Sequence, residues 1–378
     1  MSLEQRSEEL KLHDTGAPAA PDTGAPAEPD TSAPAEPGTA APSGQGARPR
    51  RWPGSMRALR FSNFSALYVG AGLFALFSLW VPDTFLRTST FTTILSEQAI
   101  TGIVAVGLVL PFAAGAFDLS FAYNVGFGSI LVAWMIGDHG FPVWAAVVLA
   151  VAACTAIGAI NGALVTVVGI NSVIATLGVG SCLSAATNWV SGGNQIIGLS
   201  NAFQSIADDS LLGISLPVYY LLALALIAWF ALEHNPWGRR VYAVGGNREA
   251  ARLAGIRADR IVFTTLTLVG AAAGFAGVLV SAQIGAGDPS VGPPYLLPAF
   301  AGVFLGSTQI HRGRFNVWGT VVAVLVLAMG VKGLQLAGAP FWLPDMFNGV
   351  ALIVAVGISQ GEHVRQFLAR LRRLRAPD

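Results

Sequence analysis

Ten long apolar runs, separated by short polar breaks, fill the chain from residue 64 onward. A helix needs about 20 apolar residues to cross the hydrocarbon core of a bilayer. The pattern therefore predicts an all-α polytopic membrane protein with about ten (8–10) transmembrane helices. The predicted spans are 64–81, 95–116, 120–136, 142–167, 172–190, 217–233, 261–282, 296–308, 316–335 and 345–361. Since 296–308 is too short for a full span, we expect it to be broken or re-entrant.

The composition supports a membrane protein and argues against several other classes. Only 11% of the 378 residues are charged and 53% are hydrophobic, whereas soluble domains carry about 25% charged residues. A soluble enzyme, a nucleic-acid-binding protein and a fibrous protein therefore fit poorly. The two cysteines and five histidines lie in apolar runs or in tails and loops, so we expect no disulfide framework and no metal site.

Residues 1–58 differ from the rest of the chain because they contain a degenerate repeat of eight residues. Its copies begin at Asp14, Asp22 and Asp30 and are rich in Ala, Pro and Gly. Such a composition supplies no apolar face to bury, so we expect a disordered tail.

Basic residues are concentrated in four clusters, which test the span count independently. They lie at 48–60, 239–260, 312–314 and 365–375. Six, two and two predicted spans separate consecutive clusters, so all four fall on one face, which the positive-inside rule identifies as cytoplasmic. We therefore expect both termini in the cytoplasm, a transmembrane domain over 59–363 and a basic C-terminal tail over 364–378.

No part of the sequence indicates an energy source or a catalytic centre within this chain. A phosphate-binding loop needs a lysine followed by Ser or Thr, and neither Lys11 nor Lys332 is followed by either. No nucleophile–base pair stands out. Ion coupling would require several carboxylates in the spans, and the candidates are few, chiefly Glu97 and Asp118. We expect a transport protein that is not itself an enzyme.

The loop 234–260, after the sixth predicted span, carries six arginines against Glu249 and Asp259. Gly245 and Gly246 are predicted to break the chain, and Asn247 is a favourable N-cap. A short helix is expected over 248–254, ended by a glycine at 255.

Two turns of helix are unstable alone in water, so this helix is expected to pack against something. Leu253, Ala254 and Ile256 offer a small apolar patch flanked by arginines. An anionic-lipid-binding loop is the alternative, but the capped helix favours a protein partner.

Four stretches of the chain resemble a known family. The run from Asn235 to Ile256 is similar to the coupling loop of ATP-binding-cassette (ABC) importer permeases, in the ribose-type simple-sugar branch of the family shared with branched-chain amino-acid permeases. The other matching stretches are Asp118-Leu119-Ser120, Asn161-Gly162 with Ile174–Gly178, and Leu305-Gly306 through Gly319-Thr320.

This resemblance implies a permease subunit in the cytoplasmic (inner) membrane that imports a monosaccharide or similar small polar solute. ATP and Mg would be bound by a separate cytoplasmic ATPase, with no cofactor in this chain. Further implied partners are an extracytoplasmic solute-binding protein and a second permease subunit, identical or homologous, in the lipid bilayer; no nucleic acid is expected. The alternatives are a same-family permease for nucleosides, inositol or branched-chain amino acids, or a stand-alone secondary transporter or channel.

The resemblance also assigns the coupling contact to this loop. The candidate residues are Arg239, Arg240, Gly245, Gly246, Asn247, Glu249, Ala250, Ala251, Arg252, Leu253, Ala254, Gly255 and Ile256.

Polar residues within the spans are candidates for the translocation path. They are Asp118, Ser120, Asn124, Asn161, Asn171 and Gln283. Four of them have competing interpretations. Asp118 can cap the following helix, Asn161 can form an interhelical hydrogen bond, and Asn124 and Gln283 are similarly divided between a structural role and a path role. The spans offer amides, hydroxyls and aromatic rings rather than charges, which favours a neutral polyhydroxylated solute.

Overall fold

The computed structural model describes residues 65–309 and 313–359, all within one unit of the fold, Gly54–Asp378. The predicted tails 1–58 and 364–378 lie outside the described residues. The helices are α1 (Ser65–Trp80), α2 (Pro82–Phe85), α3 (Thr88–Ala113), α4 (Phe121–Ala133), α5 (Val143–Ala163), α6 (Ser172–Ser191), α7 (Asn201–Asp208), α8 (Leu216–Trp229), α9 (Pro236–Gly246), α10 (Arg248–Leu253), α11 (Ala258–Ile284), α12 (Leu296–Ser307), α13 (Val317–Leu336) and α14 (Leu343–Ser359).

Short π-helical turns extend three of these helices, and a 3₁₀ turn precedes a fourth. They are η1 (Trp134–Asp138), η2 (Leu164–Val168), η3 (Phe230–His234) and η4 (Pro293–Tyr295). Two antiparallel strand pairs complete the described part. In the first, β1 (Ile196–Ile197) pairs with β4 (Ala286–Gly287), and in the second, β2 (Ser210–Leu211) pairs with β3 (Ile214–Ser215).

Six helices in the described part are long and apolar enough to cross a membrane. They are Thr88–Ala113, Val143–Val168, Ser172–Ser191, Leu216–His234, Ala258–Ile284 and Val317–Leu336. The other four predicted runs form the shorter helices α1, α4, α12 and α14. The protein is therefore a polytopic helical protein as expected, but the count of ten spans and the orientation of the termini are not confirmed.

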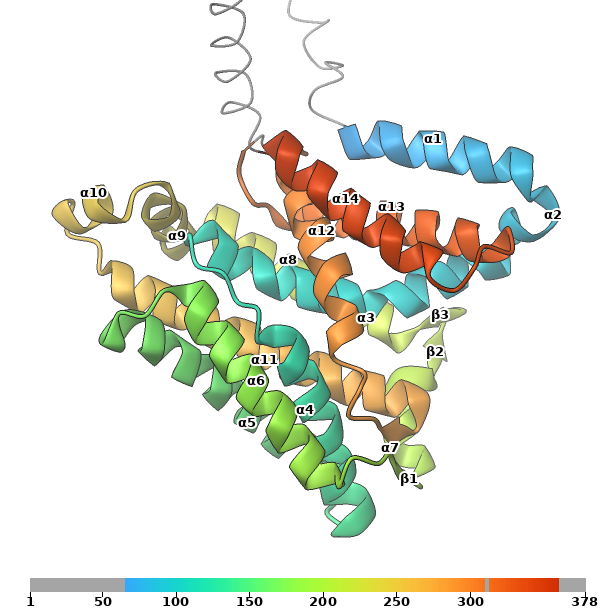
Figure 1. The fold of residues 1–378 in the computed structure, drawn as a ribbon, viewed down its shortest axis with the longest axis horizontal. Coiled ribbons are helices and arrows are strands. Elements are labelled where there is room, and N and C mark those ends of the chain that lie inside the picture. The colour runs from blue at the N-terminus through green and yellow to red at the C-terminus, as the bar shows by residue number, and fades with distance from the viewer. Residues whose placement is uncertain (1–64, 310–312, 360–378) are drawn as a thin grey trace, which may run out of the picture. The chain divides into compact units, whose positions relative to one another are not determined.

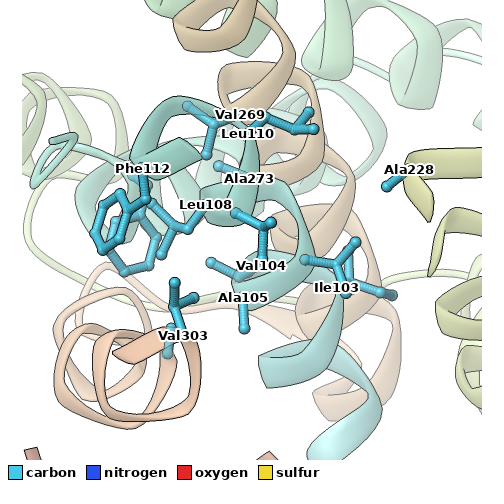
Figure 2. Packing of buried hydrophobic residues seen from close by; sticks show 14 of the residues in the cluster. Ile103, Val104, Ala105, Leu108, Leu110, Phe112, Ala228, Val269, Ala273 and Val303 are labelled. Carbon is cyan, nitrogen blue, oxygen red and sulfur yellow. The ribbon is translucent and has the colours of Figure 1, made fainter. Parts of the chain in front are cut away.

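Helices α3 and α11 form the centre of the described bundle. Figure 2 shows side chains of α3 packed between α11, α12 and α8. Helix α5 packs on α11 through small residues, because a Cβ on Gly158 would lie 2.5 Å from the Leu266 carbonyl oxygen. A Cβ on Gly270 would similarly lie 2.6 Å from the Cys154 carbonyl oxygen. Such contacts bring the two backbones close together, which is typical of helices packed within a membrane.

The segment before α12 consists of turns and contacts α4. A Cβ on Gly287 would lie 2.5 Å from the Ala133 Cβ, and a Cβ on Gly292 would meet the Ala122 carbonyl oxygen. Gly287 and Gly292 are therefore buried against opposite ends of α4, whereas Ser290 between them is exposed. The run 296–308 is a short helix of 12 residues preceded by this stretch, which matches the broken element that the sequence indicates.

The two ends of the bundle carry different structures. Helices α9 and α10 lie at one end of α11, whereas α7 and β1 lie near its other end (Figure 1). These are called the α10 end and the α7 end below.

Candidate functional site

Residues 235–257, to which the resemblance assigns the coupling contact and which are called the coupling segment below, begin with helix α9. The Asn235 side chain accepts a hydrogen bond from the Trp237 amide at 3.0 Å, and Pro236 occupies the first position of the helix. Both features favour helix initiation, because Pro lacks the amide that would be unpaired there. The prediction that Gly245 and Gly246 break the chain is wrong. Both lie in the last turn of α9, and the chain instead becomes extended at Asn247.

Helix α10 is short and is capped at both ends. The Asn247 side chain accepts a hydrogen bond from the Ala250 amide at 2.9 Å, as its position predicts. At the other end Gly255 has a φ of +79°, which glycine adopts without strain. The Gly255 amide donates to the Arg252 carbonyl and the Ile256 amide to the Ala251 carbonyl, both at 2.9 Å. This pair of bonds is a Schellman motif, so local hydrogen bonds define both ends of α10.

The predicted apolar patch on this segment is smaller than expected. The Leu253 side chain is 91% exposed and Ala254 is also exposed. Ile256, in contrast, is half-buried and packs against the main hydrophobic core, because the Schellman turn directs the chain back toward the bundle. Leu253 is therefore the main apolar side chain that this tip presents.

Charged side chains of α10 pair with the start of α11. Asp259 accepts hydrogen bonds from Arg248 at 2.6 Å and from Arg252 at 2.8 and 3.0 Å. Arg252 also lies 3.4 Å from Glu249. Arg239 and Arg240 on α9 are exposed. The predicted arginine cluster is thus divided into arginines that hold α10 in place and arginines that remain on the surface.

Helix α9 is anchored to the rest of the bundle by buried side chains. Val241 and Val244 belong to the main core. The Tyr242 hydroxyl donates to the Phe315 carbonyl at 2.8 Å, and the Arg314 guanidinium lies 3.5 Å from the centre of the Tyr242 ring. Burial, together with the negative charge of Glu233, raises the pKa of Tyr242 above its ordinary value. Tyr242 therefore stays neutral and acts as a fixed donor.

Gly245 brings the end of α9 into contact with the α3–α4 turn, residues 114–120. A Cβ on Gly245 would lie 2.1 Å from the Ala113 carbonyl oxygen and 3.2 Å from the Gly115 amide nitrogen. Only glycine allows this approach without a shift of the backbone. The coupling segment is therefore in direct backbone contact with the start of the turn that carries Asp118.

Three of the six predicted path residues form one buried polar cluster. The Ser120 hydroxyl donates to Asp118 Oδ1 at 2.7 Å, and the Asn161 side-chain amide donates to the Ser120 hydroxyl at 2.7 Å. The Ser120 amide also donates to Asp118 Oδ1 at 2.8 Å. Asn161 bonds from α5 to the residue that precedes α4, which is close to the interhelical hydrogen bond expected as its alternative. Asp118 is not the N-cap of α4: that position is Ser120, which makes no side-chain cap bond, and Asp118 instead accepts from the Ser120 amide.

Two further residues hold the α3–α4 turn, and the sequence analysis did not select them. The Phe117 amide donates to the Ser172 hydroxyl, and the Leu119 amide donates to the Thr176 hydroxyl, each at 3.1 Å. Both hydroxyls come from the first turns of α6. Thr176 lies within the block Ile174–Gly178 that resembles the family, so the resemblance pointed to this region. Its partner Leu119 is 57 residues away, however, and the sequence does not show that the two meet.

The remaining path candidates do not join this cluster. Asn124 lies one turn farther along α4, where its amide donates to the Cys154 carbonyl at 3.1 Å. Asn171 is exposed and caps α6 by accepting from the Val173 amide. Gln283 is exposed near the end of α11. In the described ranges, the side-chain oxygens of Asn124 and Asn161 are buried without a hydrogen-bond partner.

The chemistry of the cluster suits binding and conformational change. Its groups are amides, hydroxyls and a single carboxylate. Within residues 65–309 and 313–359, no group of three or more His, Cys, Asp or Glu side chains is placed to hold a metal ion.

Comparison with known proteins gives one family and several relatives. A model of the family described as "Branched-chain amino acid transport system / permease component" matches residues 90–356. The ribose import permease protein RbsC of Bacillus subtilis is 31% identical over 275 residues, which are 72% of this chain and 85% of that protein. The D-allose transport system permease protein AlsC of Escherichia coli is 28% identical over 303 residues, covering 80% and 93% of the two chains.

A third relative extends this set. The autoinducer 2 import system permease protein LsrD of Photorhabdus luminescens is 30% identical over 290 residues, covering 74% of this chain and 87% of its own length. No solved structure matches the chain.

Proposed function

Since this chain belongs to the branched-chain amino acid transport system permease family, we propose that it is the membrane-spanning permease subunit of an ABC importer for a monosaccharide or a similar small polar solute. It is a multi-pass plasma membrane protein. In this proposal a separate cytoplasmic subunit binds ATP and Mg and performs the hydrolysis. The chain itself supplies the path and receives the motion of the ATPase.

The observation that carries this proposal is the exposed tip of the coupling segment. Leu253 is 91% exposed on a helix of six residues that is capped at both ends. Such a short helix would not persist alone in water, so the two caps and the pairs with Asp259 give it a fixed shape. An exposed leucine with arginines on both sides suits a groove on a protein partner. The ATPase is therefore proposed to bind here, with Arg239, Arg240 and the tip of α10 as contacts.

Backbone contacts connect the proposed ATPase contact with the proposed translocation path. The end of α9 touches Ala113 and Gly115 at the α3–α4 turn, and this turn carries the Asp118–Ser120–Asn161 cluster. Movement of the coupling segment would therefore displace the turn directly. Coupling of ATP hydrolysis to access requires contacts that differ between two states, and the cluster is the proposed place where they change.

The proposed solute class rests on the relatives and on the amides and hydroxyls of the cluster, which accompany the single carboxylate of Asp118. The three relatives are named as permeases for ribose, D-allose and autoinducer 2. Amides and hydroxyls bind polyhydroxylated compounds through hydrogen bonds in both directions. The second candidates are nucleosides, inositol and branched-chain amino acids, the last because the family carries their name.

A solute-binding protein is proposed to dock at the α7 end, on the loops 191–216 and 283–295. These loops are tied together, because β1 pairs with β4 and the Gln195 amide donates to Asp288 at 2.5 Å. Burial of Asp288 opposes its ionisation, but hydrogen bonds from Ser290 and Gln195 outweigh it and lower its pKa. The strand pair therefore holds the two loops together, and the ionised Asp288 gives their surface a negative charge. A second permease subunit, identical or homologous, is proposed to complete the path.

Reconstitution tests the proposal. The purified chain in proteoliposomes is compared with and without the ATPase and binding protein of its host, using uptake of labelled D-ribose and D-allose. Uptake only in the presence of both partners and ATP is expected. Uptake by the chain alone would instead show a stand-alone secondary transporter or channel.

A further inference from the structure

A second polar site lies outside the coupling segment and the polar cluster. It is a cavity of about 210 Å³ between α3, the η4–α12 segment, α13 and α14. Its polar lining residues are Glu97, Gln98, Thr101, Tyr295 and Asn348, and the α13 side is apolar. Ser96, next to this lining, accepts a hydrogen bond from Ser215 at 2.8 Å, which places the cavity toward the α7 end.

Several polar groups in this lining have no hydrogen-bond partner among the described residues. Asn348 is only 7% exposed, its side-chain oxygen is buried, and neither end of its amide bonds another described residue. The side chains of Gln98 and Thr101 and the hydroxyl of Tyr295 also make no hydrogen bond within the described residues. Buried polar groups are normally hydrogen-bonded, so the buried oxygen of Asn348 in particular favours a polar occupant. Gln98 and Tyr295 are partly exposed beside it.

The only ion pair that reaches the cavity lining in the described part is Glu97 with Lys332. The Lys332 ammonium donates to Glu97 Oε1 at 2.9 Å and to Oε2 at 3.1 Å. This pair joins α3 to α13 and cancels both charges. A neutral ligand can therefore hydrogen-bond the free lone pairs of the carboxylate without disturbing the pair. A zwitterion, such as an amino acid, carries two charges of its own. To pair them here, it would have to separate Glu97 from Lys332.

The size and lining of the cavity restrict the ligand further. Pockets for drug-sized ligands measure about 300–1,000 Å³, so this cavity admits only one small molecule. Amides and hydroxyls supply donors and acceptors together, and Tyr295 adds an aromatic ring. This combination suits a compact molecule that carries several hydroxyl groups around a ring.

We propose that this cavity binds the neutral polyhydroxylated solute inside the permease, near the side on which the solute enters. Gln98, Thr101 and Asn348 are the specificity-determining side chains, and Glu97, held by Lys332, accepts hydrogen bonds from hydroxyl groups. The inference rests on the proposed function. It adds that the membrane subunit itself recognises the solute rather than only admitting it.

Direct binding to the full chain in lipid nanodiscs tests this site. Saturation-transfer NMR is recorded with D-ribose, D-allose, myo-inositol and, as a zwitterion, L-leucine. At least one neutral compound is expected to bind, and L-leucine is not. Thr101→Val and Asn348→Leu should each weaken binding about tenfold, as expected for loss of one hydrogen bond to a buried side chain.

Thr265→Val is the matched control, because Thr265 is buried in α11 and bonds only its own helix at the Val262 carbonyl. It should leave binding unchanged. If Asn348→Leu fails to fold, the isosteric Thr101→Val still decides the outcome.

Uptake by host cells separates the two proposals. If the cells take up a polyol only when this chain is present, and yet the purified chain binds none, the cavity proposal is overturned and the proposed function stands. The same holds if Thr101→Val binds as tightly as the unmodified chain, or if L-leucine binds at these residues. If the cells take up none of the neutral compounds, the proposed solute class fails as well.

Discussion

Helix α10 and the α3–α4 turn both lie between longer helices, but their side-chain hydrogen bonds have different ranges. At α10, Asn247 bonds Ala250, three residues away, and Arg252 bonds Asp259, seven residues away. In the turn, side-chain bonds join residues 41, 55 and 57 positions apart. The first structure keeps its internal bonds wherever it moves. The second exists only while α4, α5 and α6 stay packed together.

This difference predicts that substitutions in the two regions affect the stability of the protein differently. Damage to the turn should lower the stability of the whole bundle, because its polar groups are buried and their partners are distant. Damage to α10 should alter its own shape or its contact with a partner and leave the bundle intact, whereas α9 is anchored in the core and should respond like the turn. The predictions below test that contrast, ordered by their expected effect on the free energy of unfolding.

Ser120→Ala should have the largest effect. It removes the hydroxyl that donates to Asp118 and accepts from Asn161, which leaves buried polar groups with fewer partners. The expected loss is about 3 kcal/mol, the upper part of the range for an unsatisfied buried group. Denaturant titration in mixed micelles measures it. Ser205→Ala, on α7, removes only a bond to the Ala202 carbonyl and serves as the control, so equal losses for both variants would remove the contrast.

Gly245→Ala should cost about 2 kcal/mol, because the new Cβ would collide with the Ala113 carbonyl and force the backbone to shift. The neighbouring Gly246→Ala is its matched control, since a Cβ there would meet no atom within 4 Å. The same titration, together with solute uptake, compares the two variants. The close contact is unimportant if both variants behave like the unmodified chain.

Asn247→Ala should destabilise α10 by about 1 kcal/mol, the usual cost of losing an N-cap, and leave the bundle unchanged. Hydrogen exchange of the Ala250 and Ala251 amides should become faster. Asn247→Asp keeps a capping oxygen and should preserve slow exchange. A drop in global stability for Asn247→Ala would show that α10 is coupled to the core more tightly than its local bonds indicate.

Leu253→Gln should change stability by less than about 0.5 kcal/mol, because the side chain is exposed. Binding of the ATPase subunit should nevertheless weaken, since the variant removes the main apolar contact of the tip. Co-purification and ATP-dependent uptake measure this loss. Thr264→Ala, an exposed position on α11, should leave both unchanged; full activity of Leu253→Gln would exclude the tip as the contact.

The same contrast explains what the sequence could predict. The N-cap at Asn247 and the stop at Gly255 depend on residues a few positions apart, so a local pattern predicts them, and the structure agrees. The bond between Leu119 and Thr176 depends on how two helices meet, which no local pattern contains. Asp118, Ser120 and Asn161 were selected as separate candidates, and only the fold shows that they share one network.

Two errors have the same physical origin. Gly245 was interpreted as a chain break because glycine disfavours helix, but here it permits close contact with the end of α3. Ile256 was assigned to an exposed patch because it follows Leu253 and Ala254, but the Schellman turn directs it into the core. In each case a tertiary contact overrides the local preference.

The short helix α12 has a consequence for how the protein is made. Its 12 residues span roughly 18 Å at 1.5 Å per residue, against a hydrocarbon core of about 30 Å. During synthesis this segment has too few apolar residues to enter the bilayer independently, and the turns that precede it also lack a helix that could enter with it. We expect α12 to integrate late, after the amino-terminal half has already assembled into a receptive scaffold.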